Sequence, residues 1–348
     1  MEKQISYKFN PYTFARICAM KSLLLKKEDY DRIMKRDVNE IIKLLQEGVY
    51  GEEINALGLK YKGAELLENA LNKHLSKIFS RLRIVADPNT GALMDQYLKR
   101  YDFFNLKTLL RAKQTRIASE DILDYLLPVG FLDAKTLKSL YDKDSLKEIM
   151  EHSKLVNLTD YRDALARYDE NNDLAEIENL LDYHYYLDTV EFAKSIPDNG
   201  KLFREFFFYE FDTYNLKLVL KKLHFKLDKE NVKKFVINAG KELAPSFINS
   251  LLDLDNMQDF LKEINKTSYR KIFSESQTQL PLLKFEVLLE SMLLWKRILL
   301  YHKNLLSVDV VLGYMFAKEI EVKNLRVIVK SKALELTEDY IKNLIVIR

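Results

Sequence analysis

The chain has 348 residues, of which 47% are hydrophobic and 31% charged, and this balance is typical of a folded, soluble protein rather than a disordered one. The 55 basic residues nearly cancel the 52 acidic ones, leaving a formal net charge of +3 with no basic block, so the sequence predicts no nucleic-acid surface. The single cysteine, Cys18, excludes an internal disulfide and any multi-cysteine metal site.

The N-terminal stretch lacks the pattern of a signal peptide. Arg16 and Lys21 interrupt its apolar residues, and no small-residue cleavage site follows. Nowhere in the chain do about 18 apolar residues run without interruption, so no segment is expected to span a membrane. We therefore expect any membrane contact to be made through protein partners.

Glycine and proline are scarce, with 9 and 6 residues. A hairpin-rich β protein needs such residues about every ten positions, so the composition favours long helices. Apolar residues recur at spacings of three and four within 33–45 and again within 174–181, which is the period of an amphipathic helix. The predicted fold class is all-α.

Clear helix starts follow in chain order. Asp37 and Glu40 have the spacing of a capping box, in which two side chains satisfy the first backbone N–H groups of a helix. Similar starts recur at Ser145 and Asn256, at nearly equal intervals along the chain. Each start is followed by a tyrosine, at Tyr50, Tyr161 and Tyr269.

The clearest pattern is a ten-residue motif that occurs three times, at 102–111, 212–221 and 321–330. It consists of an acid, two residues, Asn-Leu, a base, three mostly apolar residues and a second base. The three copies are almost evenly spaced along the chain. The acid, asparagine and first base of the copies are Asp102, Asn105 and Lys107; Asp212, Asn215 and Lys217; and Glu321, Asn324 and Arg326.

A third set of markers keeps the same interval. Helix starts at Ser119, Asp228 and Thr337 are evenly spaced, and each is followed by acids that suit a helix N-terminus. The shared period of about 110 residues is longer than that of common solenoids, so the three markers predict three repeat units that are each a small helical bundle. We place the units at 1–130, 131–240 and 241–348.

The repeated motif has two interpretations. Asparagine is a mediocre helix former, so its recurrence inside three helices needs a reason. In the structural interpretation, the acid and asparagine form a hydrogen-bonded network that fixes helix register inside each unit. In the functional one, they form a ring of polar groups facing a shared axis and open to a partner. We favour the structural interpretation, although both can hold. The copies also differ, since Leu223 stands where the other two have Lys113 and Lys332.

Two acidic clusters invite a catalytic interpretation. Glu120-Asp121 with Asp124, and Asp255 with Asp259, resemble the magnesium-diphosphate motifs of isoprenoid synthases, where carboxylates one helical turn apart bind a cation. Both clusters coincide with repeated helix starts, where acids are favoured whatever the chemistry, so we favour the capping interpretation.

No other motif predicts chemistry. The five histidines form no His-Glu-x-x-His pair, and His74 and His184 occupy equivalent positions in two repeat units, which indicates a shared packing role. No glycine-rich phosphate loop and no nucleophile elbow are found. We therefore expect no catalytic site, no metal and no cofactor.

The triplicated motif, the opening Tyr12-Thr-Phe-Ala15-Arg16 and the closing stretch from Asn324 to Lys332 resemble the C subunit of the archaeal and bacterial A/V-type ATPases, a relative of the d subunit of the vacuolar ATPase. The resemblance covers essentially the whole chain and implies a non-catalytic rotor component. It implies three helical domains that form a funnel around a pseudo-threefold axis. The funnel would lie on the cytoplasmic face of the membrane proteolipid ring and receive the tip of the central stalk, which the D and F subunits form.

Two other functions remain as alternatives. The first is a generic all-helical scaffold that binds other proteins and has no part in ion pumping. The second is an isoprenoid-type enzyme that uses the acidic clusters.

Overall fold

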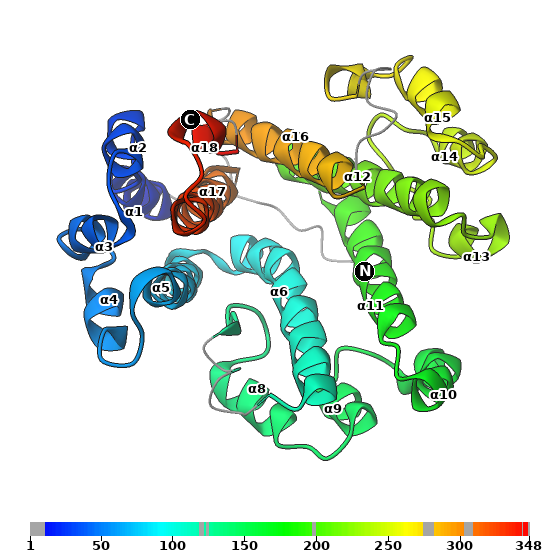
Figure 1. The fold of residues 1–348 in the computed structure, drawn as a ribbon, viewed down its shortest axis with the longest axis horizontal. Helices are drawn as coiled ribbons and strands as arrows, with labels where there is room; N and C mark the ends of the chain where they lie inside the picture. The colour runs from blue at the N-terminus through cyan, green and yellow to red at the C-terminus, as the bar shows by residue number, and fades with distance from the viewer. Residues whose placement is uncertain are drawn as a thin grey trace. The chain divides into compact units, whose positions relative to one another are not determined.

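The structure, a computed structural model, describes residues 11–117, 122, 125–196, 200–273, 282–302, 309–342 and 344–346. Within these residues the regular elements are helices and no strand is found, so the all-α prediction is confirmed (Figure 1). Among the same residues, no helix has the length and apolar character needed to cross a bilayer.

The chain divides into two compact units, residues 1–174 with 301–348, and residues 175–300. The helices of the first unit are α1 (Pro11–Lys21), α2 (Lys27–Met34), α3 (Val38–Gln46), α4 (Gly51–Leu57), α5 (Gly63–Val85), α6 (Pro88–Thr115), α8 (Ala134–Tyr141), α9 (Leu146–Ser153), η2 (Leu158–Tyr161), α10 (Arg162–Asn171), α17 (Asp309–Ala333) and α18 (Glu338–Lys342). Those of the second are α11 (Ala175–Ser195), α12 (Lys201–Phe225), α13 (Lys229–Lys233), α14 (Pro245–Leu252), α15 (Met257–Ile264), η4 (Ser268–Lys271) and most of α16 (Leu282–His302).

The predicted capping residues begin the expected helices. The Asp37 carboxylate accepts a hydrogen bond from the backbone N–H of Glu40 at 2.9 Å, and the Glu40 carboxylate accepts one from Asp37 N–H at 3.1 Å. Ser145 and Asn256 likewise accept from the third backbone N–H of α9 and α15, at 3.2 and 2.9 Å. These three predicted starts are confirmed.

The other set of starts is confirmed where the structure describes it. Asp228 accepts from the N–H of Asn231 at 3.0 Å and caps α13, and α18 begins directly after Thr337. The predicted start at Ser119 lies outside the described residues. The apolar run 327–329 belongs to α17, as the repeat requires.

In the first unit, α17 is the most deeply buried helix. Every residue from Asp309 to Val322 is buried, which is the signature of a helix surrounded by others. The 23-residue α5 packs along α17, α1 contacts both helices, and α3 and α4 cover α5. Elsewhere in this unit, α8 and α9 pack on α6.

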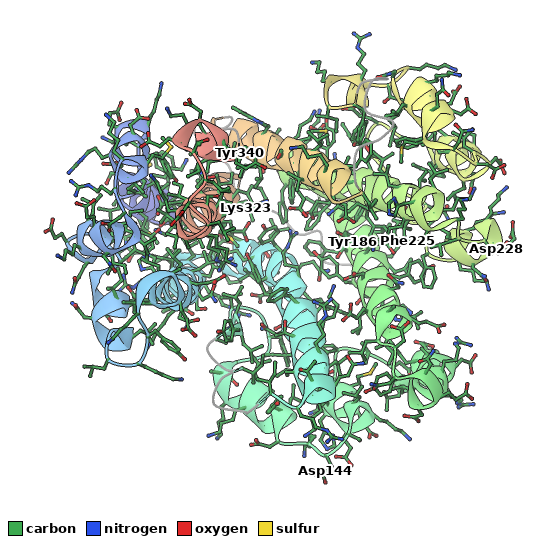
Figure 2. All side chains as sticks on the ribbon, viewed as in Figure 1. Asp144, Tyr186, Phe225, Asp228, Lys323 and Tyr340 are labelled. Carbon is green, nitrogen blue, oxygen red and sulfur yellow. The ribbon has the colours of Figure 1, made fainter. Side chains whose placement is uncertain are left out.

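In the second unit, α12 is central and α11 packs along it. Tyr186 lies on α11 (Figure 2). Its ring centroid is 4.4 Å from that of Tyr214 on α12. The core continues through buried residues of α14, α15 and α16, including Leu251, Phe260 and Phe285. The first unit therefore carries two copies of the motif, on α6 and α17, and the second carries one, on α12.

Candidate functional site

The three copies of the motif lie on α6, α12 and α17, helices of 28, 25 and 25 residues. The motif acids and asparagines are at most 2% exposed, so all six are removed from water. They are Asp102, Asn105, Asp212, Asn215, Glu321 and Asn324. A buried polar side chain is costly unless it is hydrogen-bonded, so the partners of these six residues decide what the motif does.

The three asparagines make the same pair of hydrogen bonds, which we call the asparagine clamp. Asn105 Nδ2 donates to the carbonyl of Leu127 at 2.7 Å, and Asn105 Oδ1 accepts from the N–H of the same residue at 2.8 Å. Asn215 and Asn324 do this with Ile237 and Val346, at distances of 2.8 to 3.0 Å. In every copy the partner lies 22 residues downstream. The clamp therefore ties the end of each repeated segment to its long helix.

The two motif aspartates bind the loop that follows the clamp. Asp102 accepts from the backbone N–H groups of Phe131 and Leu132, at 2.7 and 2.9 Å. Asp212 accepts from three consecutive N–H groups, those of residues 241–243, at 2.9 to 3.3 Å, and from the Tyr269 hydroxyl at 3.2 Å. Both aspartates thus satisfy backbone N–H groups of a partly exposed loop that follows the clamp.

Gly130 and Gly240 allow the backbone of this loop to lie directly against the carboxylates of Asp102 and Asp212. A Cβ on Gly130 would lie 2.3 Å from Asp102 Oδ2, and one on Gly240 would lie 2.1 Å from Asp212 Oδ1. No side chain can occupy such positions without displacing the carboxylate. Sequence reasoning missed these two residues, although they occupy equivalent positions in two copies of the repeat.

Replacing Gly240 by alanine is expected to lower the free energy of unfolding by about 1 to 3 kcal/mol, because the new methyl group overlaps the Asp212 carboxylate. The matched control is Gly91→Ala in α6, where a Cβ meets nothing within 4 Å and alanine is expected to add about 0.5 to 1 kcal/mol. Urea unfolding of both variants tests this. Equal stability of the two would contradict the steric role of Gly240.

The third copy of the motif differs because Glu321 receives donors from the N-terminal segment. Its carboxylate accepts from the N–H of Leu25 at 2.6 Å, from the Tyr50 hydroxyl at 2.5 Å and from Lys318 Nζ at 2.7 Å. Leu25 precedes α2 as Leu132 precedes α8, so residues near the N-terminus fill the place of the downstream loop. We call these contacts the terminal closure.

The terminal closure continues into a buried polar network. Lys318 Nζ also donates to the Tyr50 hydroxyl at 3.0 Å, and the Tyr50 ring lies 4.4 Å from that of His74. His74 Nδ1 is 3.1 Å from a carboxylate oxygen of the buried Glu53. Burial, and secondly the charge of Lys318, lower the pKa of His74 to about 4. His74 is therefore neutral near pH 7 and donates from Nδ1 to Glu53.

Acidification is expected to weaken the first unit through His74. Its pKa is about 4 in the folded chain and near 6.5 when unfolded, so the unfolded chain binds more protons between these values. Stability is then full above pH 6.5 and is lost as the pH falls toward 4, with a loss of about 2 kcal/mol at pH 5. Urea unfolding at pH 7 and pH 5 checks this. His74→Gln should remove that difference, whereas exposed His152→Gln should retain it.

The contribution of Asp212 to the stability of the second unit changes with pH in the opposite direction. Burial raises its pKa to about 6, against the hydrogen bonds from Glu242, Leu243 and Lys241, which lower it. A carboxyl whose folded pKa is raised contributes most below its unfolded pKa, and that contribution is lost as the pH rises through 6. Asp212 and His74 therefore contribute to stability in opposite directions as the pH falls.

The three motif bases are half-buried and have unlike surroundings. Lys217 Nζ lies 3.1 Å from a Glu290 carboxylate oxygen, and an Arg326 Nη2 donates to the Asn72 side chain. Burial lowers the pKa of Arg326. Lys107 is also half-buried, and its side chain interacts with another group. Lys217 and Arg326 thus have different partners, whereas the three asparagines make the same pair of contacts.

A lysine near the end of each long helix compensates for the difference at Leu223. Lys113 Nζ donates to the carbonyl of Tyr141, the last residue of α8, at 3.4 Å. In the second unit the neighbouring Lys222 donates to the carbonyl of Leu254, just beyond α14, at 2.5 Å. The same contact is made from an adjacent position, so the substitution does not remove it.

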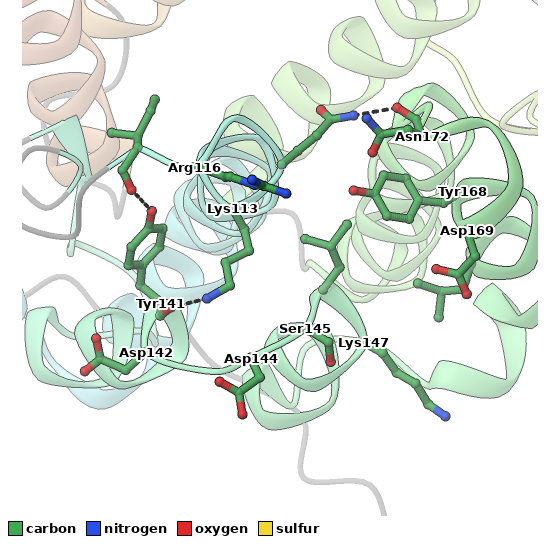
Figure 3. Close-up of a pocket in the computed structure, with 14 residues that line it drawn as sticks. Lys113, Arg116, Tyr141, Asp142, Asp144, Ser145, Lys147, Tyr168, Asp169 and Asn172 are labelled. Atoms are coloured by element: carbon green, nitrogen blue, oxygen red, sulfur yellow. Dashed lines mark hydrogen bonds between the residues drawn. The ribbon is translucent and has the colours of Figure 1, made fainter.

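A cavity of about 960 Å³ lies where the C-terminal ends of α6, α8 and α10 meet the start of α9 (Figure 3). Gln114 closes one side by donating to the Asn172 carbonyl at 2.6 Å. The charged residues in its lining are three basic and three acidic ones, so neither an anion nor a cation is favoured. They are Lys113, Arg116, Lys147, Asp142, Asp144 and Asp169.

Asp255 and Asp259, the residues of the acidic clusters that the structure describes, do not form a metal site. Asp259 is the third residue of α15, and its carboxylate accepts a hydrogen bond from the side chain of the capping Asn256 at 2.8 Å. Asp255 is exposed and pairs with Lys222 Nζ at 3.2 Å. Glu120, Asp121 and Asp124 lie outside the described residues. Among the residues that the structure does describe, no group of three or more metal-binding side chains gathers.

Comparison with known proteins identifies the family. The sequence model described as "ATP synthase (C/AC39) subunit" matches residues 13–344. The A-type ATP synthase C subunit of Methanococcoides burtonii is 32% identical over 97% of this chain and 94% of its own length. The protein of the same name from Methanosarcina barkeri is 33% identical over 97% of this chain and 92% of its own, and that from Haloquadratum walsbyi is 29% identical over 96% and 97%.

These matches cover all three copies of the motif and nearly the whole chain, and they confirm the resemblance inferred from the repeats. The chain belongs to the family of ATP synthase (C/AC39) subunits.

Proposed function

We propose that this chain is a non-catalytic rotor subunit that couples a central stalk of D and F subunits to the membrane proteolipid ring of an A/V-type ATPase. In this role it lies on the cytoplasmic face of the membrane and contacts the membrane through protein partners. It needs no cofactor. Family membership supports the assignment to a rotary ATPase, and the clamped helices support the mechanical role.

The observation that carries the proposal is the asparagine clamp. The three motif helices have 25 to 28 residues and are therefore about 38 to 42 Å long. Each helix is tied by two buried hydrogen bonds to a segment 22 residues away. Such contacts hold each long helix and the non-helical segment that follows it in a fixed register, which suits a part that must transmit torque.

We further propose that the repeat units 1–130, 131–240 and 241–348 correspond to three bundles arranged as a funnel with pseudo-threefold symmetry. The equivalent clamps on α6, α12 and α17 support three related units. The asparagines bond within their own repeat units, whereas the acids accept hydrogen bonds from residues of another unit, as Glu321 does from Leu25 and Tyr50. All six side chains are buried and bonded to this chain. The half-buried bases Lys107, Lys217 and Arg326 are the motif residues that a partner could reach.

A co-elution experiment tests the proposal. The purified chain, a D–F pair and detergent-solubilised proteolipid ring are mixed and separated by size, and a single species that contains all three is expected. Elution of a folded, helical chain free of both partners would reject the rotor role and leave a helical scaffold for other proteins. Prenyl diphosphate consumption that depends on magnesium and is lost in Asp121→Ala would instead establish the enzyme.

A further inference from the structure

The first unit carries a groove of about 700 Å³ between α1 and α5, which we call the α1–α5 groove. One wall comes from α1 and the turn after it, with Arg16, Met20 and Leu23. The other comes from α5, with Ile78, Arg81 and Ile84. Buried residues of α17 and α5 close its floor.

Apolar side chains at the mouth of the groove face solvent. Leu23 is 60% exposed and Ile84 is 82% exposed, and they belong to opposite walls. Met20, Ile78 and Val85 extend the apolar lining inward. Exposed apolar residues that continue into a concave surface mark an interaction site more often than scattered ones do.

Cationic side chains outnumber acidic ones in the lining of the groove. Its lining contains four cationic side chains and one acidic one, Glu52. Lys77 is neutralised by Glu52 and Glu53, at distances of up to 3.0 Å, and Lys318 by Glu321 at 2.7 Å. Arg16 and Arg81, one on each wall, are exposed and form no ion pair with the part of the chain that the structure describes.

We propose that the α1–α5 groove docks an acidic amphipathic helix of a partner protein. Two facing helices with an apolar channel between them suit the apolar stripe of a third helix, read at positions i, i+3, i+4 and i+7. Carboxylates beside that stripe meet the guanidinium groups of the two walls, whose planar donors match carboxylate geometry. The proposal concerns this surface alone and does not depend on the rotor role.

The test uses the full chain and a synthetic fluorescent 16-residue helix with leucine along one stripe and glutamate elsewhere. Fluorescence anisotropy at low ionic strength is expected to show binding that weakens at least tenfold in the double variant Arg16→Gln, Arg81→Gln. Ile84→Ser should weaken binding without changing its salt dependence. Both guanidinium groups and Ile84 are exposed, so these variants are expected to fold, which circular dichroism checks.

Two controls test whether binding depends on the negative charge of the peptide and on the two arginines. The same peptide with lysine in place of glutamate should bind at least tenfold more weakly, and Lys135→Gln, an exposed cation on α8, should bind the acidic peptide like the parent chain. Equal affinity for the two peptides, or no effect of the arginine substitutions, would overturn the proposal. So would binding of phosphatidylglycerol vesicles through Arg16 and Arg81 with no binding of the peptide.

Discussion

Replacing Glu321 by alanine is expected to lower the free energy of unfolding by about 3 to 5 kcal/mol, the cost of leaving one partner of a buried ion pair uncompensated. The Lys318 side chain is only 3% exposed and loses the carboxylate that neutralises it. The Leu25 N–H and the Tyr50 hydroxyl lose their acceptor at the same time. Urea unfolding followed by circular dichroism measures the loss.

A double variant separates charge burial from simple loss of packing. Lys318→Met combined with Glu321→Leu removes both charges and keeps similar side-chain volume, so it is expected to recover much of the stability. Limited proteolysis gives a second readout, because cleavage near Leu25 should become faster in Glu321→Ala. A Glu321→Ala chain within about 1 kcal/mol of the parent would show that the terminal closure contributes little.

Removing one asparagine clamp is expected to be nearly as costly. In Asn215→Ala the N–H and carbonyl of Ile237 both lose their partner inside the protein, at about 1 to 3 kcal/mol for each buried group. We expect a loss of about 2 to 6 kcal/mol in total. The chain has one tryptophan, Trp295 on α16, so its fluorescence reports unfolding of the second unit directly.

The control for this prediction is Asn179→Ala on α11. Asn179 is exposed, and alanine is the better helix former, so this substitution is expected to be neutral or slightly stabilising. Asn105→Ala and Asn324→Ala should resemble Asn215→Ala, because all three clamps have the same geometry. If Asn215→Ala matched Asn179→Ala instead, the clamp would not be the contact that holds the repeated segment.

Much of the secondary structure follows from neighbours in sequence. The capping box of Asp37 and Glu40 is made by groups three residues apart, so a short pattern is enough to predict it. The apolar residues 327–329 of the third motif lie in α17, as the equivalent residues of the other two copies lie in α6 and α12. These features depend on local spacing, and the sequence displays local spacing directly.

The tertiary contacts of the motif could not be predicted from local spacing in the sequence. The interpretation of Asn105 as a buried, satisfied amide was reached from its odd place in a helix, but its partner 22 residues away was not. Gly130 and Gly240 were missed because a glycine that permits close approach has no side-chain pattern of its own. The available signal was that each glycine follows its motif acid at the same interval in sequence.

The amino-acid sequence was sufficient for the all-helical class, the threefold repetition and the family, because periodicity and capping act over a few residues and recur. Only the folded chain decided what Glu321 binds, since Leu25 lies 296 residues away and nothing in local spacing relates the two. The same holds for the α1–α5 groove, whose walls are separated in sequence. Contacts between distant segments depend on how whole helices pack, and packing is a property of the three-dimensional core rather than of any short pattern.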